Sequence, residues 1–368
     1  MKKIYDLEAE ENKKTRAFLV GLPLLHNPGG LDELNGLVWT LGMETAGQMI
    51  LQRLEVQPAY GMGSGKAKEI CQAAQEAQAD CIIMDWELDP TKQRNWEKLA
   101  KIPVFDRQEV IIRIFASRAS TKEAVLQVEL ARLEYSLPRL AHMYGDLARQ
   151  RGGNYGSKGS GEKQLELDRR SIRLKIQQLK AELAKVRQNR ATQRKRRQKI
   201  PLPTIALCGY TNAGKSSLMN ALTGSDTLVE NKLFATLDPL TRRIKLAGAE
   251  ILLTDTVGFI SNLPHQLIDA FKSTLEEAAV SDALLIVIDA SDPNALAQAK
   301  TVKDVLKEIG ADEKKTLVAL NKIDALEGAG AVEVQALKAE FDGAVEISAK
   351  TGLGLGLLKA KISAIIKE

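Results

Sequence analysis

The sequence is poor in cysteine and aromatic residues and has no long apolar run. Its three cysteines, Cys71, Cys81 and Cys208, stand in apolar or helical surroundings without metal-ligand spacing, which argues against a disulfide framework and for a reducing compartment. No apolar run approaches the roughly 18–20 residues that span a bilayer, and the N-terminus lacks the apolar segment of a secretory signal. We therefore expect a cytoplasmic protein without a membrane span.

What the 368 residues do contain is ordinary for a globular protein, with 44% hydrophobic and 27% charged residues. A chain of this length is expected to hold two or three domains, each with its own core. The net charge of +5 is modest, so the distribution of charge along the chain is more informative than its sum.

Residues 1–116 alternate between strand and helix patterns. Short apolar runs predict strands at Arg16–Leu22, 48–56, Asp80–Asp85 and Ile102–Phe105, with helix-periodic segments between them. This alternation is typical of a small, mostly parallel α/β domain.

One stretch of this domain, Gly61–Lys66, is superficially similar to a phosphate loop. It lacks the four-residue gap before the Gly-Lys pair, and Ala67 follows the lysine where a Mg²⁺-binding hydroxyl is needed. Two interpretations stay open: a flexible loop at the start of a helix, or a second nucleotide or RNA contact.

Residues 117–200 carry two apolar seams that step by four and three residues, which predicts an antiparallel coiled-coil hairpin. The first seam is Leu126, Leu130, Leu133, Leu137, Leu140, Tyr144 and Leu147, and the second is Ile172, Ile176, Leu179, Leu183 and Val186.

The expected hairpin tip, 149–163, is rich in glycine and cations and has no aliphatic residue. Such a tip cannot bury itself, but it can approach a phosphate backbone, neutralise its charge and stack an aromatic ring on a base. The residues expected to contact RNA are Arg149, Arg151, Tyr155, Lys158 and Lys163. A basic run at 187–199 also favours a polyanion. The alternative is a solvated turn and a solvated helix face.

The most specific motif is Gly209–Ser216, which matches G-x-x-x-x-G-K-[ST] between an apolar strand and an amphipathic helix. Backbone N–H groups and the helix N-terminus of this motif surround phosphate oxygens. We expect Lys215 to contact the β- and γ-phosphates and Ser216 to bind Mg²⁺.

Further motifs follow in the order that a GTPase needs. Thr236 is placed to bind Mg²⁺ and the γ-phosphate, while Asp255 and Gly258, in D-x-x-G, would hold Mg²⁺ and sense the γ-phosphate. The base motif N-K-x-D ends in Asp324, whose carboxylate can accept from guanine N1–H and N2–H₂, a pair that adenine does not offer. Asn321 and Lys322 are expected at the base, and Ser348–Lys350 would supply the Ala349 amide to guanine O6.

The motifs together predict a C-terminal P-loop domain of the Ras-like GTPase type at 201–368, after the α/β domain and the hairpin. The expected nucleotide-binding residues are Gly209, Tyr210, Thr211, Asn212, Ala213, Gly214, Lys215, Ser216, Ser217, Phe234, Thr236, Asp255, Gly258, Asn321, Lys322, Asp324, Ser348, Ala349 and Lys350. Catalysis is assigned to Lys215, Thr236 and Gly258, and Mg²⁺ binding to Ser216, Thr236 and Asp255.

The attacking water lacks its usual partner, because Phe259 stands where many GTPases carry a glutamine. Its orientation must come from backbone groups, another side chain or a partner, so we expect slow turnover that a partner accelerates. Asn212 has two open interpretations: it helps to hold a K⁺ ion at the phosphates, or it braces the loop.

The nucleotide motifs resemble translation-factor-related GTPases, and two longer stretches resemble the HflX family, related to Obg. Asp255–Glu277 is similar to that family's switch II segment, and Arg151–Glu166 with Asp168–Arg170 is similar to its glycine-rich loop. The family's G-P-G-E is replaced here by Gly159–Glu162. The chain ends soon after Ser348–Lys350, so we expect the extra C-terminal domain of some members to be absent.

The resemblance implies GTP-dependent binding to the large ribosomal subunit, with the hairpin tip in ribosomal RNA, and splitting of ribosomes, including those stalled under heat stress. It also implies ATP binding in the N-terminal region of some members. We expect a monomer. Two alternatives stay open: an assembly GTPase that acts on immature large subunits, and a protein-binding switch whose hairpin dimerises.

Overall fold

The computed structural model describes residues 14–23, 30–54, 57–150, 158–197, 202–224, 233–246, 249–261, 277–326 and 330–367. The chain forms two compact units: residues 1–117 with 129–180, and residues 118–128 with 181–368. Among the described helices, none combines the length and the apolar character that crossing a bilayer requires.

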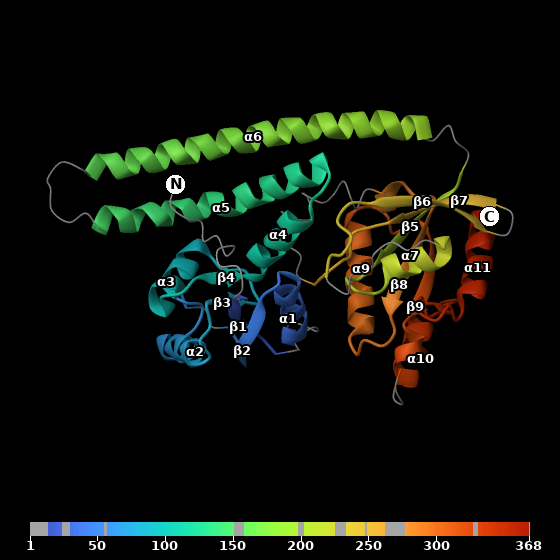
Figure 1. The fold of residues 1–368 in the computed structure, drawn as a ribbon, viewed down its shortest axis with the longest axis horizontal. Coiled ribbons are helices and arrows are strands. Elements are labelled where there is room, and N and C mark those ends of the chain that lie inside the picture. Colours follow the sequence, from blue (N-terminus) through green and yellow to red (C-terminus); the bar gives the residue numbers. More distant parts are fainter. Residues whose placement is uncertain are drawn as a thin grey trace. The chain divides into compact units, whose positions relative to one another are not determined.

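The N-terminal unit contains a four-stranded parallel sheet in the order β2-β1-β3-β4 (Figure 1). Its strands are β1 (Arg16–Gly21), β2 (Glu44–Ile50), β3 (Cys81–Met84) and β4 (Val104–Asp106). Its helices are α1 (Gly30–Thr40), α2 (Ser64–Glu76), α3 (Pro90–Ala100) and α4 (Arg107–Arg118). The predicted parallel α/β domain is confirmed.

Alternate residues of these strands face opposite sides of the sheet, as the two-residue period of a strand requires. Phe18, Val20 and Ile82 pack with apolar residues of α2 and α3 in one core cluster. The strand expected at 48–56 lies earlier in the chain, since β2 runs over Glu44–Ile50 and pairs with β1 from Glu44 onward. β2 is an edge strand with several exposed residues, so its pattern lacks the apolar run of a buried strand.

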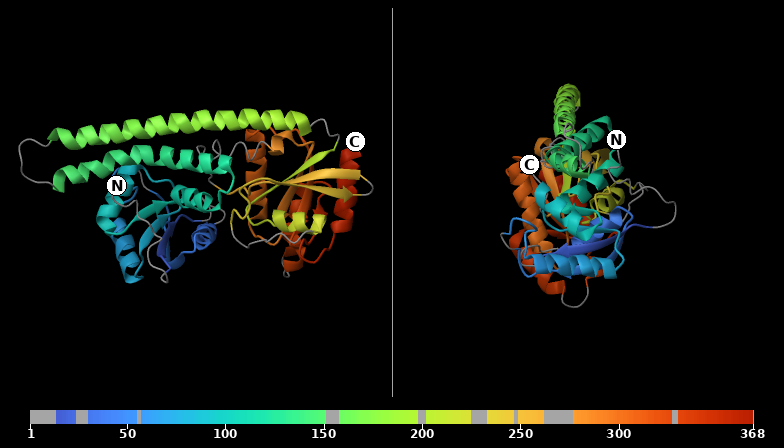
Figure 2. Two further views of the ribbon diagram at one scale, coloured as in Figure 1. Left: turned by 45° about the horizontal axis from the view of Figure 1, so that its top comes forward. Right: turned by 90° about the vertical axis from the view of Figure 1, so that its left-hand side faces the viewer.

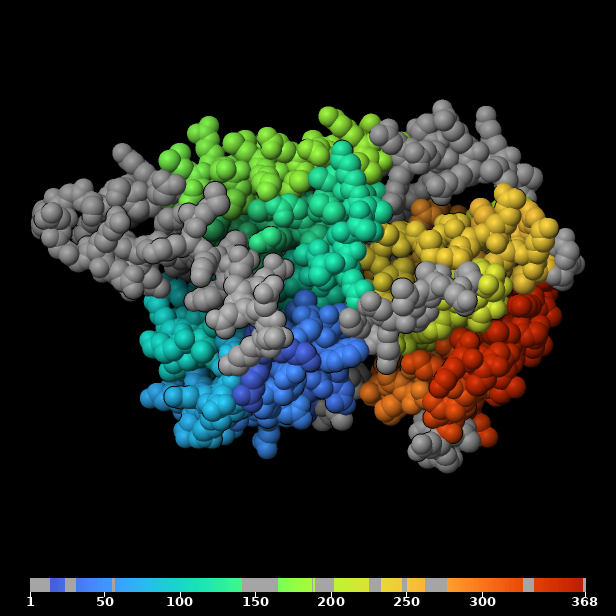
Figure 3. Space-filling view, in the orientation of Figure 1, coloured from blue at the N-terminus to red at the C-terminus, as the bar shows by residue number. Residues whose placement is uncertain are grey.

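Two long helices, α5 (Lys122–Gln150) and α6 (Lys158–Arg197), form the predicted hairpin. They lie side by side in the ribbon views, and their coloured parts adjoin in the space-filling view (Figures 1, 2 and 3). The second seam is buried at Ile176, Leu179 and Leu183. Ion pairs Lys175–Glu129 (2.6 Å) and Lys180–Glu134 (2.7 Å) flank it.

The hairpin tip, expected at 149–163, has more helix than its glycines predict. α5 continues to Gln150 and α6 begins at Lys158, since a glycine in an established helix costs only about 1 kcal/mol relative to alanine. The side chains expected to contact RNA, and residues 151–157 altogether, lie outside the described part of the chain.

The second unit contains a six-stranded sheet in the order β10-β9-β8-β5-β7-β6, in which only β6 runs antiparallel to its neighbour. The strands are β5 (Thr204–Gly209), β6 (Leu240–Leu246), β7 (Ala249–Asp255), β8 (Ala283–Asp289), β9 (Lys315–Asn321) and β10 (Val345–Glu346). The helical elements are α7 (Lys215–Thr223), α9 (Ala295–Glu308), η1 (Ile323–Ala325), α10 (Gly330–Glu340) and α11 (Leu355–Lys367).

Because β5, β7, β8, β9 and β10 run parallel, their carboxyl ends lie at the same end of the sheet. α7 and α11 pack their apolar residues on one face, through Leu218, Met219, Leu358 and Ile362 among others. β5 lies between β8 and β7, so the loop from β5 to α7 opens at the middle of that end. In open α/β sheets this is where ligands bind.

Candidate functional site

The loop between β5 and α7 carries two glycines whose positions admit no other side chain. A Cβ at Gly209 would collide with the backbone carbonyl oxygen of Val287, and one at Gly214 would collide with the amide nitrogen of Asn321. Gly214 also has φ +90°, a left-handed conformation that L side chains rarely adopt. The loop therefore wraps closely around the start of α7, as a phosphate-binding loop must.

Lys215 is almost fully buried and lies inside this loop. Its Nζ donates to the carbonyl oxygens of Gly209 (3.0 Å) and Tyr210 (2.8 Å), which leaves one of three ammonium protons for a phosphate. Burial lowers the pKa of Lys215 to about 8, and the Asp255 charge opposes that shift. Phosphate oxygens in the loop would favour the charged form further.

Three oxygen-bearing side chains from three separate segments meet beside Lys215. Asp255 Oδ2 accepts from Ser216 Oγ (2.7 Å) and Thr236 Oγ1 (3.0 Å), and the two hydroxyls are 2.9 Å apart. Asp255 Oδ1 is buried and makes no hydrogen bond within the described residues. Burial raises the pKa of Asp255, while Lys215 and the two hydroxyls oppose the shift. A buried carboxylate with one unsatisfied oxygen, whose other oxygen bonds two hydroxyls, fits a hard divalent cation such as Mg²⁺.

The D-x-x-G segment pairs directly with the phosphate loop. The Thr211 amide donates to the Phe259 carbonyl (2.7 Å), and the Phe259 amide donates to the Gly209 carbonyl (3.1 Å). A Cβ at Gly258 would lie 2.8 Å from Thr211 Cα and 3.0 Å from Lys215 Nζ. Glycine is therefore needed at 258, where the backbone closely approaches Thr211 and the ammonium group of Lys215.

The opposite end of the site is built around Asn321, which is 2% exposed. Its Nδ2 donates to the Ala213 carbonyl (2.8 Å), and its Oδ1 accepts from the Ala349 amide (3.0 Å). Asn321 thus braces the phosphate loop against the 349 loop, where the sequence predicted contacts to the base. Lys322 forms an ion pair with Asp289 (2.6 Å), and Asp324 follows it within the short helix η1.

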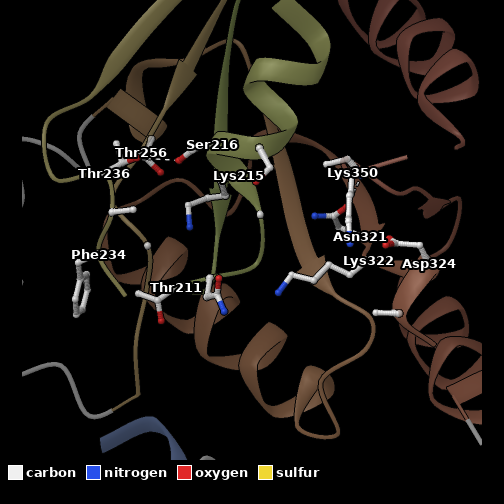
Figure 4. A pocket seen from close by; sticks show the side chains of 17 residues that line it. Thr211, Lys215, Ser216, Phe234, Thr236, Thr256, Asn321, Lys322, Asp324 and Lys350 are labelled. Carbon is white, nitrogen blue, oxygen red and sulfur yellow. Dashed lines mark hydrogen bonds between the residues drawn. The ribbon is translucent and has the colours of Figure 1, made fainter. Parts of the chain in front are cut away.

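Most of the expected site residues line one cavity of about 450 Å³ (Figure 4). In the view, Ser216, Thr236 and Thr256 gather at one end, while Asn321, Lys322, Asp324 and Lys350 gather at the other. Expected residues that line it are Thr211, Asn212, Gly214, Lys215, Ser216, Ser217, Phe234, Thr236, Gly258, Asn321, Lys322, Asp324, Ala349 and Lys350. Expected residues outside the lining are Gly209, Tyr210, Ala213, Asp255 and Ser348.

Three lining residues were missed by sequence reasoning: Ala235, Thr256 and Ala325. Each is a neighbour of an expected residue, so adjacency was the available signal. Thr256 reaches the cavity through its position in D-x-x-G, while its hydroxyl donates away from it, to the Leu207 carbonyl (2.6 Å).

Comparison with known proteins agrees with this site. Residues 204–322 match a family described as 50S ribosome-binding GTPase, residues 29–116 the N-terminal region of a GTP-binding GTPase, and residues 118–197 its middle region. The chain is 46% identical over 369 residues to GTPase HflX of Akkermansia muciniphila, covering 96% of this chain and 84% of that protein. The chain belongs to the HflX GTPase family. An HflX of Escherichia coli K12 is 45% identical, covering 81% of this chain and 70% of that protein.

Solved structures support the same assignment. A crystal structure of SsGBP with GDP is 28% identical with a TM-score of 0.53, covering 96% of this chain and 98% of that chain. A GTP-binding protein from Sulfolobus solfataricus, also in complex with GDP, is 28% identical with a TM-score of 0.51 and the same coverage. This HflX-family chain therefore binds guanine nucleotides and hydrolyses GTP.

Proposed function

We propose that this HflX-family GTPase binds the large ribosomal subunit in its GTP state and splits or rescues ribosomes, including those stalled under heat stress. The observation that carries the proposal is one chain that joins a complete nucleotide cavity to a long basic hairpin. The 40 residues of α6 give a helix about 60 Å long, which is enough to reach deep into a ribonucleoprotein. The match to ribosome-binding GTPases supports the same partner.

At the phosphate end, Lys215 would neutralise the β- and γ-phosphates, and the Gly258 amide would meet the γ-phosphate. Ser216 and Thr236 would bind Mg²⁺ directly, and Asp255 would hold it through water. Bound there, Mg²⁺ would neutralise charge on the phosphates and the leaving oxygen.

At the base end, Asp324 is proposed to accept from guanine N1–H and N2–H₂, with Lys322 along the ring and the Ala349 amide toward O6. Asp289 would hold Lys322 in place through its ion pair. For Asn321 the contacts favour a bracing role, since both ends of its amide already bond to loop backbone.

Asn212 is proposed to help hold a K⁺ ion at the phosphates. It lines the cavity with φ +62°, and its side chain makes no hydrogen bond within the described residues. GTP turnover by Asn212→Ala should then lose its preference for KCl over NaCl at equal ionic strength. An equal loss of rate in both salts would indicate that Asn212 only braces the loop.

The hairpin tip and the basic run at 187–199 are proposed to contact ribosomal RNA. The triple variant Arg149→Ala, Arg151→Ala, Lys158→Ala should keep its GDP affinity and lose binding to isolated large subunits, with a reduced salt dependence. A matched control removes the same charge from the middle of α6, through Lys175→Ala, Lys180→Ala and Lys185→Ala. If both triple variants lose the same amount of binding to the large subunit, the tip contributes only its positive charge and makes no specific contact with RNA.

Splitting is tested by sucrose gradients of intact ribosomes with GTP-loaded protein, which should shift 70S particles toward free subunits. Turnover in K⁺ buffer should also rise strongly when large subunits are added, because Phe259 cannot orient water. Precursor particles that accumulate on depletion at normal temperature would favour the assembly alternative. GTP turnover that is fast for the protein alone and unchanged by added large subunits would favour the alternative of a protein-binding switch.

For Gly61–Lys66 the contacts favour the loop at a helix start over a second nucleotide or RNA contact. Gly63 caps α2 without a side-chain hydrogen bond, and Lys66 pairs with Glu69 (2.7 Å) on the surface of the helix. The proposed division into 1–116, 117–200 and 201–368, and the monomeric state, remain to be tested by limited proteolysis and by light scattering.

A further inference from the structure

The phosphate loop contacts the D-x-x-G segment through a side chain that does not line the nucleotide cavity. The hydroxyl oxygen of Tyr210 accepts from the backbone amide of Ser261 at 2.6 Å. Tyr210 is 7% exposed, and Phe259, which pairs with it in a β-bridge, is 1% exposed. The tyrosine is therefore held between two motifs instead of facing the nucleotide, which its place in the G-x-x-x-x-G-K-S motif had suggested.

This contact extends the backbone pairing of the same two segments. Residues 210 and 259 form a parallel β-bridge, with hydrogen bonds from the Thr211 and Phe259 amides on either side. The Tyr210 hydroxyl adds a third hydrogen bond two residues further along the D-x-x-G segment. Together the three bonds fix the direction in which this segment leaves the phosphate loop.

Gly258 lies at the start of the segment so fixed. Its close approach to Thr211 Cα and Lys215 Nζ puts the 258 backbone beside the ammonium that serves the γ-phosphate. A hydrogen-bond donor that is already ordered before the phosphate binds loses little conformational entropy when it binds. Because the side chain of Phe259 is buried and cannot hydrogen-bond, the order of this segment has to come from backbone contacts and from the phosphate loop.

We propose that Tyr210 is a positioning residue for GTP hydrolysis: its hydroxyl holds the Gly258–Ser261 backbone against the phosphate loop, so that the Gly258 amide is preset for the γ-phosphate. GDP lacks that phosphate, so the contribution of Tyr210 is specific to GTP and to the transition state.

The test is Tyr210→Phe, which removes the hydroxyl and keeps the ring. The GDP dissociation constant should stay unchanged, whereas affinity for a non-hydrolysable GTP analogue and kcat should each fall about ten-fold, the loss expected when a partly buried amide loses its acceptor. Hydrogen exchange of the Ser261 amide should accelerate in the same variant.

Tyr135→Phe is the matched control. It also removes a buried hydroxyl, one that donates to Asp106 (3.0 Å) in the N-terminal unit, and should lower stability without changing the ratio of GTP-analogue to GDP affinity. The proposal is overturned if Tyr210→Phe weakens the binding of GDP and of the GTP analogue equally, since the hydroxyl then stabilises the phosphate loop for any nucleotide. It is also overturned if Ser261 exchange and kcat stay at wild-type values.

Discussion

Replacing Arg139 of α5 by methionine is expected to destabilise the N-terminal unit by about 3–5 kcal/mol, because it leaves a buried carboxylate without its counter-charge. Asp106 is fully buried, and its Oδ2 lies 3.1 Å from Arg139 Nη2. The same guanidinium donates to the Leu88 carbonyl (2.8 Å) and to Gln93 Oε1 (2.8 Å). Those acceptors lose their donor too, so the cost should lie well above that of a surface ion pair.

The pH dependence of this variant follows from the carboxyl group. Burial raises the pKa of Asp106, and Arg139 opposes the shift. Without the guanidinium the pKa rises further, so the folded state binds the proton more tightly than the unfolded chain does. Stability is then lost as the pH rises above the ordinary aspartate value, and Arg139→Met should be closest to wild type at acid pH.

Native-state hydrogen exchange at the amides of β3 and β4 is the suitable assay, since a chain of two units has no single unfolding transition. Asp106→Asn combined with Arg139→Met should cost less than the sum of the single changes, because both charges are then gone. Lys175→Ala is the control: its pair with Glu129 is exposed and should contribute at most about 1 kcal/mol.

Two outcomes would refute this reasoning. A cost below about 1 kcal/mol for Arg139→Met would mean that water or a neighbouring group replaces the guanidinium at Asp106. Additive single and double variants would mean that the two side chains act independently, and that their 3.1 Å contact is not what holds α5 on the sheet.

Three further outcomes can be measured on the purified protein. Gly258→Ala should abolish GTP hydrolysis with little change in GDP affinity, because the new methyl group would meet Thr211 Cα at 2.8 Å. Maleimide at pH 8 should modify Cys71 and leave Cys208 unmodified, because burial raises the pKa of the Cys208 thiol to about 12. Ionisation of the Cys208 thiol favours unfolding, so the stability of the protein should fall as the pH rises from 9 toward 12. Asp238→Ala should speed amide exchange at the start of α5 about ten-fold, since one carboxylate accepts three hydrogen bonds there.

Short contiguous motifs allowed most of the nucleotide site to be predicted from sequence. The G-x-x-x-x-G-K-[ST] octet specifies its own loop, because each glycine meets a backbone or amide group that excludes any Cβ. The second seam of the hairpin was also readable, since Ile176, Leu179 and Leu183 are buried at the predicted spacing. In both cases the residues that determine the structure lie close together in the sequence, so a local pattern is enough to predict it.

What the sequence did not show are polar contacts between residues far apart in the chain. Arg139 and Asp106 are 33 residues apart, and an arginine on a long charged helix predicts a solvated face. Tyr210 and Ser261 are 51 residues apart, and no motif assigns either side chain to the other. Such pairs depend on which elements the whole fold brings together, and no local pattern encodes that.

The contact of Asp238 with the start of α5 shows why these pairs matter for function. Asp238 accepts from Ser120 Oγ (2.7 Å) and from the amide of Thr121 (3.2 Å), two residues that precede α5. Asp238 comes two positions after Thr236, whose hydroxyl lies 3.0 Å from Asp255 in the proposed Mg²⁺ site. A peptide of three residues spans at most about 10 Å, so a shift of Thr236 on loss of the γ-phosphate would pull on Asp238. We expect the amides at the start of α5 to exchange faster with GDP than with a GTP analogue, and this difference between the nucleotides to disappear in Asp238→Ala. Equal exchange in both nucleotide states of the wild type would show that the hairpin does not sense the nucleotide through this carboxylate.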